Sequence, residues 1–120
     1  MSKKLIGDWG ESQAAVYLED KGYEVVATGF RCRFGEIDLI AVHEAFVVFV
    51  EVKTRRDARF AEAREFVDRH KQARIYATAL HWLAEYKTEL QPRFDVIEIY
   101  APRGVETERP EILHWEDAFQ

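Results

Sequence analysis

The chain has 120 residues, of which 48% are hydrophobic and 32% are charged, and its formal net charge is −5. This size and composition are typical of a single soluble globular domain covering residues 1–120, and no apolar run approaches the ~20 residues of a membrane span. The negative net charge argues against tight non-specific binding to duplex DNA.

The start of the chain and its cysteine content both point to the cytoplasm. Residues 1–11 contain two lysines but no apolar segment of the kind found in secretory signals. Cys32 is the only cysteine, which excludes an internal disulfide and fits a reducing compartment. We therefore expect a cytoplasmic protein that does not contact the membrane.

Charge is distributed unevenly along the chain. Residues 53–74 hold eight Lys or Arg against four acids, whereas residues 75–120 hold four basic residues against nine acidic ones. A chain with a basic middle and an acidic C-terminal third can present one positive face despite its net charge.

Residues 3–21 are predicted to form a helix that is capped by Ser2 and ended by Gly22. Glu11 shares a helical stripe with small and apolar side chains, which would carry its carboxylate towards a sheet. The members of this stripe are Gly7, Ala14, Ala15 and Leu18. A second apolar stripe on the same helix is the alternative, and its burial would leave Glu11 in solvent. That stripe consists of Leu5, Trp9 and Val16.

Residues 23–28 are predicted to form a strand, and residues 29–35 a loop or a strand entry with two arginines. Residues 35–53 follow as two apolar runs separated by a short polar break, which is the pattern of a hairpin.

Four charged residues interrupt the apolar runs of this hairpin. A two-residue turn at 44–45 places Asp38 opposite Glu51, and the same register places Glu36 opposite Lys53. Two carboxylates held this close in an apolar sheet favour a cation between them. Two alternatives stay open: the charges form a solvated face, or a register shifted by one separates the two acids.

A second helix is predicted after a basic loop at 54–59 and a short helical turn at 61–67. It begins at the N-cap Asp68 and runs to about residue 87. Lys71 and Arg74 lie at its N-terminal end, where a helix favours anions, although they can equally be solvated residues. The expected apolar stripe consists of Ala73, Tyr76, Ala77, Leu80, Leu83 and Ala84.

The remaining chain predicts two strands. Residues 93–100 alternate strictly, with Ile97 and Ile99 on the face opposite Val96, and residues 112–115 form a final edge strand.

Asp38 followed by Glu51-Val52-Lys53 resembles the D…(D/E)-x-K signature of the restriction-endonuclease-like nuclease superfamily. The spacing alone is easily met by chance, but the match covers nearly the whole chain up to about residue 100. The matching segments are Gly7-x-x-Gly10-Glu11, Gly22-Tyr23, Arg31, 35–40, 48–53 with Arg55, Val67, Lys71 and 93–96. Together they resemble the bacterial YraN-like family, which is similar to archaeal Holliday junction resolvases. In that family Asn often stands where this chain has Gly29, and Gly where it has Ala61.

The resemblance implies a restriction-endonuclease-like α/β fold. This is a three-layer core whose mixed sheet contains an antiparallel hairpin and is flanked by helices, in the order αβββαβ. It also implies a phosphodiesterase that depends on Mg²⁺ or Mn²⁺, with Asp38 and Glu51 as metal ligands. Glu11 would hold a second metal or a metal-bound water. Lys53 would orient or activate a water, or stabilise developing charge.

The same resemblance implies DNA as the partner, in a branched or otherwise structured form that is recognised by shape. The residues expected to contact phosphates are Arg31, Arg55, Arg56, Lys71 and Arg74. Junction resolvases act as symmetric dimers, so a homodimer is one arrangement open to this chain. Trp115 and Phe119 are apolar candidates for such an interface, or alternatively pack on the chain's own core.

Two other functions stay open from the residues alone. A non-catalytic nucleic-acid-binding or scaffold protein would keep the fold and suit the acidic net charge, and a metal-binding module without nucleic acid is the third. The presence of every expected catalytic residue favours the enzyme.

Overall fold

The computed structural model describes residues 2–57 and 67–119, which form two α-helices and five strands. In chain order the elements are α1 (Lys3–Asp20), β1 (Glu24–Cys32), β2 (Gly35–His43), β3 (Phe46–Arg55), α2 (Arg69–Glu85), β4 (Gln91–Tyr100), the 3-10 turn η2 (Gly104–Glu106) and β5 (Glu111–Trp115). The expected order αβββαβ is confirmed, and β5 is the expected final edge strand. The helical turn expected at 61–67 falls almost wholly outside the described residues.

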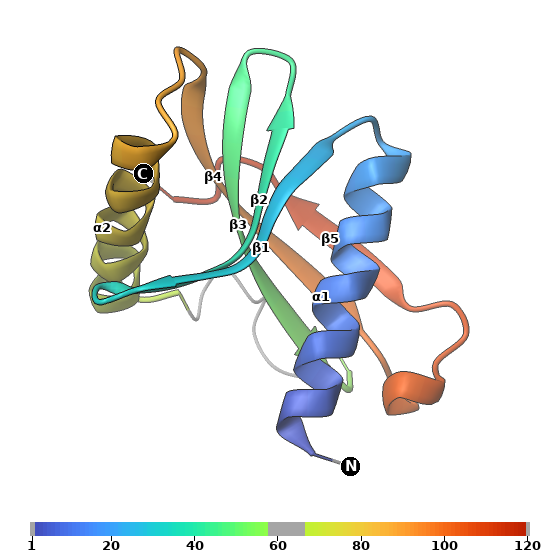
Figure 1. Cartoon of the computed structure of the whole chain (residues 1–120). Helices are drawn as coiled ribbons and strands as arrows, with labels where there is room; N and C mark the ends of the chain where they lie inside the picture. Colours follow the sequence, from blue (N-terminus) through green and yellow to red (C-terminus); the bar gives the residue numbers. More distant parts are fainter. Residues whose placement is uncertain (1, 58–66, 120) are drawn as a thin grey trace.

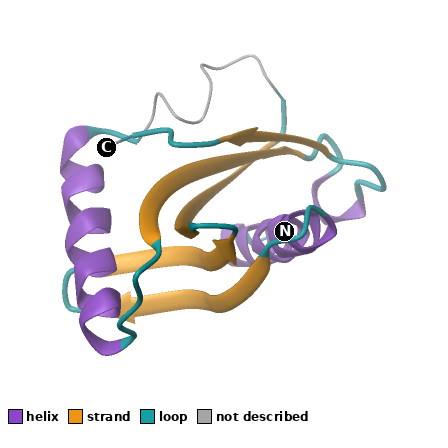
Figure 2. Cartoon of the chain, turned by 90° about the horizontal axis from the view of Figure 1, so that it is seen from above, coloured by secondary structure: helices purple, strands orange, loops and turns teal. Residues whose placement is uncertain are grey.

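The strands form one mixed sheet in the order β1-β2-β3-β4-β5. β1, β2 and β3 pair antiparallel, β3 and β4 pair parallel, and β5 returns antiparallel to β4. A parallel pair needs a crossover connection, and α2 lies in the connection between β3 and β4. Helix α1 covers one face of the sheet and α2 the other, which gives the three expected layers (Figure 1 and Figure 2). Among the described residues, neither helix combines the length and the apolarity that crossing a bilayer requires.

Helix α1 begins at the predicted cap, because the Ser2 hydroxyl accepts a hydrogen bond from the Leu5 N–H at 3.1 Å. Its buried residues are Gly10, Ala14 and Leu18. In the alternative stripe Leu5 and Val16 are 51% and 58% exposed, whereas Trp9 is partly buried against the core. The stripe that carries Glu11 is therefore the one that packs on the sheet.

Gly10 lies where α1 meets β3. A Cβ atom at Gly10 would lie only 1.9 Å from Oγ1 of Thr54, whereas nothing lies within 4 Å of a Cβ at Gly7. We expect Gly10→Ala to lower the free energy of unfolding by about 1–3 kcal/mol, because the helix must shift or Thr54 must repack. Gly7→Ala should instead raise it by about 0.5–1 kcal/mol, since alanine loses less backbone entropy in a helix.

Urea unfolding of the two alanine variants measures this difference. Adding Thr54→Ala to Gly10→Ala should recover most of the loss, because it removes the hydroxyl that the new methyl group meets. Equal effects of the two alanines would contradict the close approach of helix and strand.

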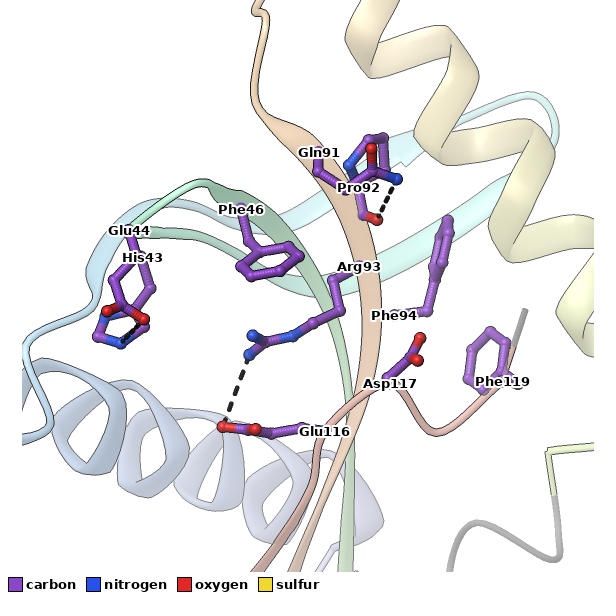
Figure 3. Close-up of a pocket in the computed structure, with 10 residues that line it drawn as sticks. All are labelled: His43, Glu44, Phe46, Gln91, Pro92, Arg93, Phe94, Glu116, Asp117 and Phe119. Atoms are coloured by element: carbon purple, nitrogen blue, oxygen red, sulfur yellow. Dashed lines mark hydrogen bonds and ion pairs between the residues drawn. The ribbon is translucent and has the colours of Figure 1, made fainter.

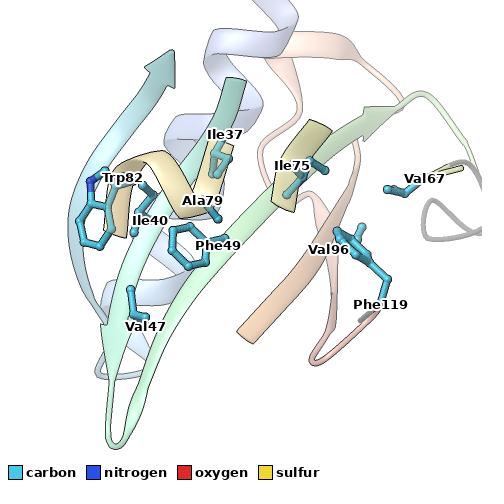
Figure 4. Close-up of a cluster of buried hydrophobic side chains, with 10 residues drawn as sticks. All are labelled: Ile37, Ile40, Val47, Phe49, Val67, Ile75, Ala79, Trp82, Val96 and Phe119. Atoms are coloured by element: carbon cyan, nitrogen blue, oxygen red, sulfur yellow. The ribbon is translucent and has the colours of Figure 1, made fainter. Parts of the chain in front are cut away.

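The sheet divides the core into two apolar layers. In the layer under α2, Phe49 contacts Trp82 edge-on at 5.8 Å between ring centroids and stacks on Phe94 at 5.5 Å. Figure 4 shows this layer, whose buried members are Ile37, Ile40, Val47, Phe49, Val67, Ile75, Ala79, Trp82, Val96 and Phe119. The layer under α1 contains Ala14, Leu18, Tyr23, Leu39, Ala41, Val48, Val50, Ile97 and Ile99. Val96 thus lies opposite Ile97 and Ile99, as the alternation in β4 predicts.

The buried face of α2 differs from the prediction. Its buried residues are Ile75, Thr78, Ala79 and Trp82, whereas Leu80 is 67% exposed, and Ala73 and Ala84 also face solvent. The predicted stripe is confirmed at Tyr76 and Leu83, which pack against the core, and is wrong at Ala73, Leu80 and Ala84. It leaves out Thr78, a polar residue at a core position. The Thr78 hydroxyl donates to the Arg74 carbonyl at 2.7 Å, which satisfies it inside the core.

β1 and β2 form a longer hairpin than the sequence suggests, since β1 continues to Cys32 and the turn lies at 33–34. Gly29 has a φ of 59°, in the left-handed region where Gly and Asn are the best tolerated residues. Asn, the residue expected at this position from the sequence resemblance, would suit the same backbone. The tip of the hairpin reaches α2 (Figure 1), where a Cβ at Gly35 would lie 3.2 Å from Oγ1 of Thr78.

Candidate active site

The candidate site lies where β2 and β3 separate. The two strands pair from His43–Phe46 to Leu39–Val50, so the predicted register is confirmed over these five pairs. Ile37 packs under α2 and Leu39 under α1, although residues two apart in a strand normally share a face. The side chains of β2 therefore change faces of the sheet at Asp38, the residue next to the last β2–β3 pair.

Asp38 holds the two strands together through its side chain. Its Oδ2 atom accepts a hydrogen bond from the Val52 N–H at 2.8 Å. Burial, followed by the nearby charge of Glu51, raises the pKa of Asp38 to about 7, although the bond from Val52 opposes the rise. The folded chain therefore holds a carboxylate whose ionised form lacks enough positive charge around it.

Glu51 is buried in β3, with 7% of its surface exposed, and is surrounded by two amines. Its Oε1 atom lies 2.5 Å from Nζ of Lys71 and 3.5 Å from Nζ of Lys53. Burial and the adjacent Lys71 amine lower the pKa of Lys53. Burial also acts to lower the pKa of Lys71, but the hydrogen bond to Glu51 and its charge outweigh burial and raise it. The two lysines are thus electrostatically unequal.

Asp38, Glu51 and Lys71 border a hollow of about 220 Å³, whereas Lys53 is not among its lining residues. Its lining residues are Glu36, Asp38, Glu51, Lys71, Arg74 and Ile75. Two carboxylates suit Mg²⁺, which keeps several waters and is usually held by one or two protein carboxylates. Within residues 2–57 and 67–119, no three Asp, Glu, His or Cys side chains are grouped so as to hold a metal ion. The carboxylates of Asp38 and Glu51 are hard oxygen donors, the ligand type that a hydrated Mg²⁺ or Mn²⁺ takes.

Glu11 lies apart from this hollow, on the side of α1. It is half-buried and lines a separate hollow of about 260 Å³ with Ser12, Thr28 and Leu39. Burial, and then the charge of Glu36, raises its pKa, and Glu51 adds to the rise. Glu11 therefore contributes negative potential to the site without sharing its cavity.

The basic residues predicted to bind phosphate fall into two groups. Lys71 and Arg74 line the site hollow, and Arg31 lies beside it, with its Nε atom 3.3 Å from Oε2 of Glu36. The ladder between β2 and β3 ends at Leu39–Val50, so the prediction that Glu36 lies opposite Lys53 is wrong, and Glu36 pairs with Arg31 of β1. The reason is the separation of β2 from β3 at Asp38.

The second group lies at the end of β3. Arg55 is half-buried opposite Tyr100 of β4, and Arg56 is exposed at the bend that follows the strand.

Comparison with known proteins identifies the family. Residues 10–99 match the family model described as "Uncharacterised protein family UPF0102". The chain belongs to the UPF0102 family. A UPF0102 protein from Caldanaerobacter subterraneus subsp. tengcongensis is 46% identical over 101 residues, which cover 83% of each chain. One from Nocardia farcinica is 44% identical over 118 residues, covering 98% of this chain and 91% of the relative. One from Geotalea daltonii is 41% identical over 117 residues, covering 97% and 90%.

A larger hollow, of about 750 Å³, lies at the other end of the sheet in this UPF0102 chain, beside the turn between β2 and β3. Figure 3 shows Arg93 extending between Phe46 and Glu116 along one side of it. The Arg93 guanidinium is occupied by Asp95, to which it donates from Nε at 2.9 Å and from Nη2 at 2.8 Å. We place the chemistry in the smaller hollow, because the buried Glu51 lies there beside Asp38, whose pKa is raised by burial.

Sequence reasoning missed two buried acids of β4. Asp95 is fully buried, and besides Arg93 it meets Nε2 of His114 at 2.7 Å and the Asp117 N–H at 3.0 Å. Glu98 is fully buried and accepts hydrogen bonds from the Tyr100 hydroxyl and from Nε1 of Trp115. Their position in the sequence could have predicted their burial, because strands of a parallel pair are usually buried on both faces.

The aromatic residues of the C-terminal tail pack on the chain's own core. Trp115 is bound to Glu98, and Phe119 is 9% exposed and stacks on Phe94 at 5.7 Å. Of the two alternatives for these residues, the structure therefore supports packing on the core over an exposed interface.

Proposed function

We propose that this protein is a Mg²⁺- or Mn²⁺-dependent endonuclease of the restriction-endonuclease-like superfamily. Its substrate would be structured DNA, branched or nicked, in repair or recombination. The observation that carries the proposal is the meeting of two carboxylates and two amines of unequal pKa where β2 separates from β3. Buried, perturbed ionisable groups in a hollow are typical of catalytic centres.

Asp38 and Glu51 are the residues that would hold the metal ion. The ion would supply Lewis-acid stabilisation of charge that develops on the phosphate oxygens. The hydrogen bond from the Val52 N–H already fixes the orientation of the Asp38 carboxylate, so its charge is in place for a cation. Glu11 adds negative potential that draws a cation to this end of the sheet.

The two lysines have different roles in this proposal. Lys71 is the charge partner of Glu51, because the ion pair keeps its amine protonated. Lys53 has the lowered pKa, so a larger fraction of its amine is neutral and able to accept a proton from an attacking water. Of the two roles that the sequence leaves open for Lys53, activation of a water and stabilisation of charge, this proposal takes the first.

DNA would be bound through its phosphates. Arg31 and Arg74 border the site, and Arg56 is exposed at the end of β3. Phosphate contacts fix the position of the nucleic acid but read no sequence, so selectivity would come from DNA shape.

A non-catalytic nucleic-acid-binding protein is the second candidate, and one observation favours it. Lys71 and Lys53 together place two amines within 3.5 Å of a single Glu51 oxygen, which neutralises that acid without a metal. In this case the arginines would still bind DNA, and no strand would be cut.

The two lysines test the proposal, because arginine keeps the positive charge but does not release its proton at neutral pH. Lys53→Arg should lower the single-turnover cleavage rate by about 100-fold or more, as expected for loss of a proton acceptor. Lys71→Arg should retain most of the rate, since arginine still pairs with Glu51. The substrates are four-way junctions, flaps and linear duplexes with Mg²⁺ or Mn²⁺.

Chelator should abolish cleavage by the wild-type chain on every substrate. Binding without cleavage in either metal would support the second candidate instead. Equal losses in the two arginine variants would contradict the division of roles between the lysines.

A further inference from the structure

The tip of the hairpin between β1 and β2 presents an aromatic ring to solvent. Arg33 and Phe34 form the turn, and Phe34 is 39% exposed. The Arg33 guanidinium lies over the Phe34 ring, 4.8 Å from its centroid, and the ring of His81 from α2 lies 6.1 Å away at 63°. The ring therefore contacts both Arg33 and α2, and 39% of its surface stays open to solvent.

The base of the tip packs closely against α2. Gly35 has a φ of 152° and lies so close to α2 that a Cβ there would be 3.2 Å from Oγ1 of Thr78 and 3.7 Å from Arg74. A surface whose groups are fixed before binding loses less entropy when a ligand is bound.

Arginines connect this tip to the candidate active site. A hollow of about 380 Å³ lies along the tip, with Arg31, Arg33 and Arg74 in its lining. Arg74 and Glu36 line both this hollow and the hollow that contains Asp38. Three guanidinium groups against the single carboxylate of Glu36 give this surface a net positive charge, although the chain as a whole carries −5.

We propose that Phe34 and Arg33 form a stacking platform for an unpaired nucleobase of the DNA strand that leaves the candidate active site. This inference rests on the proposed function and names its substrate class, which is DNA with unpaired nucleotides next to the cut. Bases stack on aromatic rings and on guanidinium planes whatever their sequence, and arginines beside the ring bind the connecting phosphates. A base inside a duplex has both faces covered by its neighbours, so a blunt duplex offers stacking faces only at its two terminal pairs and no unpaired base.

The test uses the full chain with chelator present, so that binding is measured without cleavage. One probe is a flap with 2-aminopurine in its unpaired strand, whose fluorescence reports stacking, and the other is a blunt duplex of the same length. Phe34→Ala should weaken binding of the flap by about tenfold or more and abolish the fluorescence change. Binding of the blunt duplex should not change, and Phe34→Trp should restore binding of the flap.

Tyr86→Ala is the matched control, because Tyr86 is 55% exposed at the other end of α2, away from the three arginines. It should change neither affinity. If the wild-type chain binds neither probe, the proposed function and the platform are both overturned. If it binds both probes, and Phe34→Ala weakens both equally or neither, the platform alone is overturned.

Discussion

Replacing Asp38 by asparagine should abolish DNA cleavage and, at the same time, make the metal-free protein more stable. The loss of cleavage should be about 10³-fold, since a catalytic metal ion supplies several kcal/mol and each 1.36 kcal/mol is a factor of ten. Asparagine keeps an oxygen that can accept the Val52 N–H, so the strands should stay in place. What it removes is the charge that would bind the cation.

The gain in stability follows from the raised pKa of Asp38, about 7 against an ordinary value of 3.8. Between these values the folded chain binds more protons than the unfolded chain, so the free energy of unfolding falls as pH rises through this window. Above pH 7 the ionised carboxylate therefore destabilises the fold. Asp38→Asn should raise the free energy of unfolding there by about 1–3 kcal/mol, which is less than the full linkage value because the hollow opens to water.

Urea unfolding across pH 4–8 in chelator, together with single-turnover cleavage in Mg²⁺, measures both effects. Glu36→Gln is the control, because Glu36 is an acid of the same strand whose side chain is 40% exposed and paired with Arg31. It should change stability by less than about 0.5 kcal/mol. A less stable Asp38→Asn protein would show that this carboxylate serves the fold, and the metal-binding role would have to be abandoned.

The hairpin that carries Asp38 and Glu51 was predictable because local rules fix it. A two-residue turn determines the register of both strands, and Glu44 adopts the positive φ of 53° that tight hairpins require. The N-caps at Ser2 and Asp68 were predictable for the same reason, since each side chain bonds a backbone N–H three residues away.

The geometry beyond the register depends on single long-range contacts. The side chains of β2 change faces at Asp38, where the Val52 N–H donates a hydrogen bond to its carboxylate. The periodicity of the sequence does not predict this change. The buried face of α2 includes Thr78, whose hydroxyl donates to a carbonyl of the same helix, so the residue packs in the core like an apolar one. The convergence of Lys71 on Glu51 joins two elements 20 residues apart, so the sequence places both near the site without showing that they touch.

Asp95→Asn should be the most destabilising single change outside the candidate site. Asp95 is fully buried and receives Arg93, whose side chain is only 10% exposed, together with His114 and the Asp117 N–H. Removing the charge leaves the Arg93 guanidinium with only the Tyr23 hydroxyl and the exposed Glu116, 3.9 Å away, and breaking a buried ion pair typically costs about 3–5 kcal/mol. Because the last two contacts come from β5 and the tail, the variant should also loosen the C-terminal segment, measured as faster amide hydrogen exchange at residues 114–119.

Asp8→Asn is the matched control for Asp95→Asn, since Asp8 also pairs with a basic residue but on the surface. Nζ of Lys4 lies 2.9 Å from its Oδ2 atom, with the two side chains 85% and 61% exposed. Such pairs contribute about 0–1 kcal/mol, so Asp8→Asn should hardly change the free energy of unfolding.

Burial alone would raise the pKa of Asp95, but the contacts with His114, Arg93 and the Asp117 N–H outweigh burial and lower it. The stabilising effect of Asp95 is therefore present above its ordinary pKa of 3.8 and is lost as pH falls through the lower folded value. Urea unfolding should show a wide gap between the wild-type chain and Asp95→Asn at neutral pH that narrows in acid. A gap that stays constant with pH would mean that the asparagine acts through packing rather than through the lost charge.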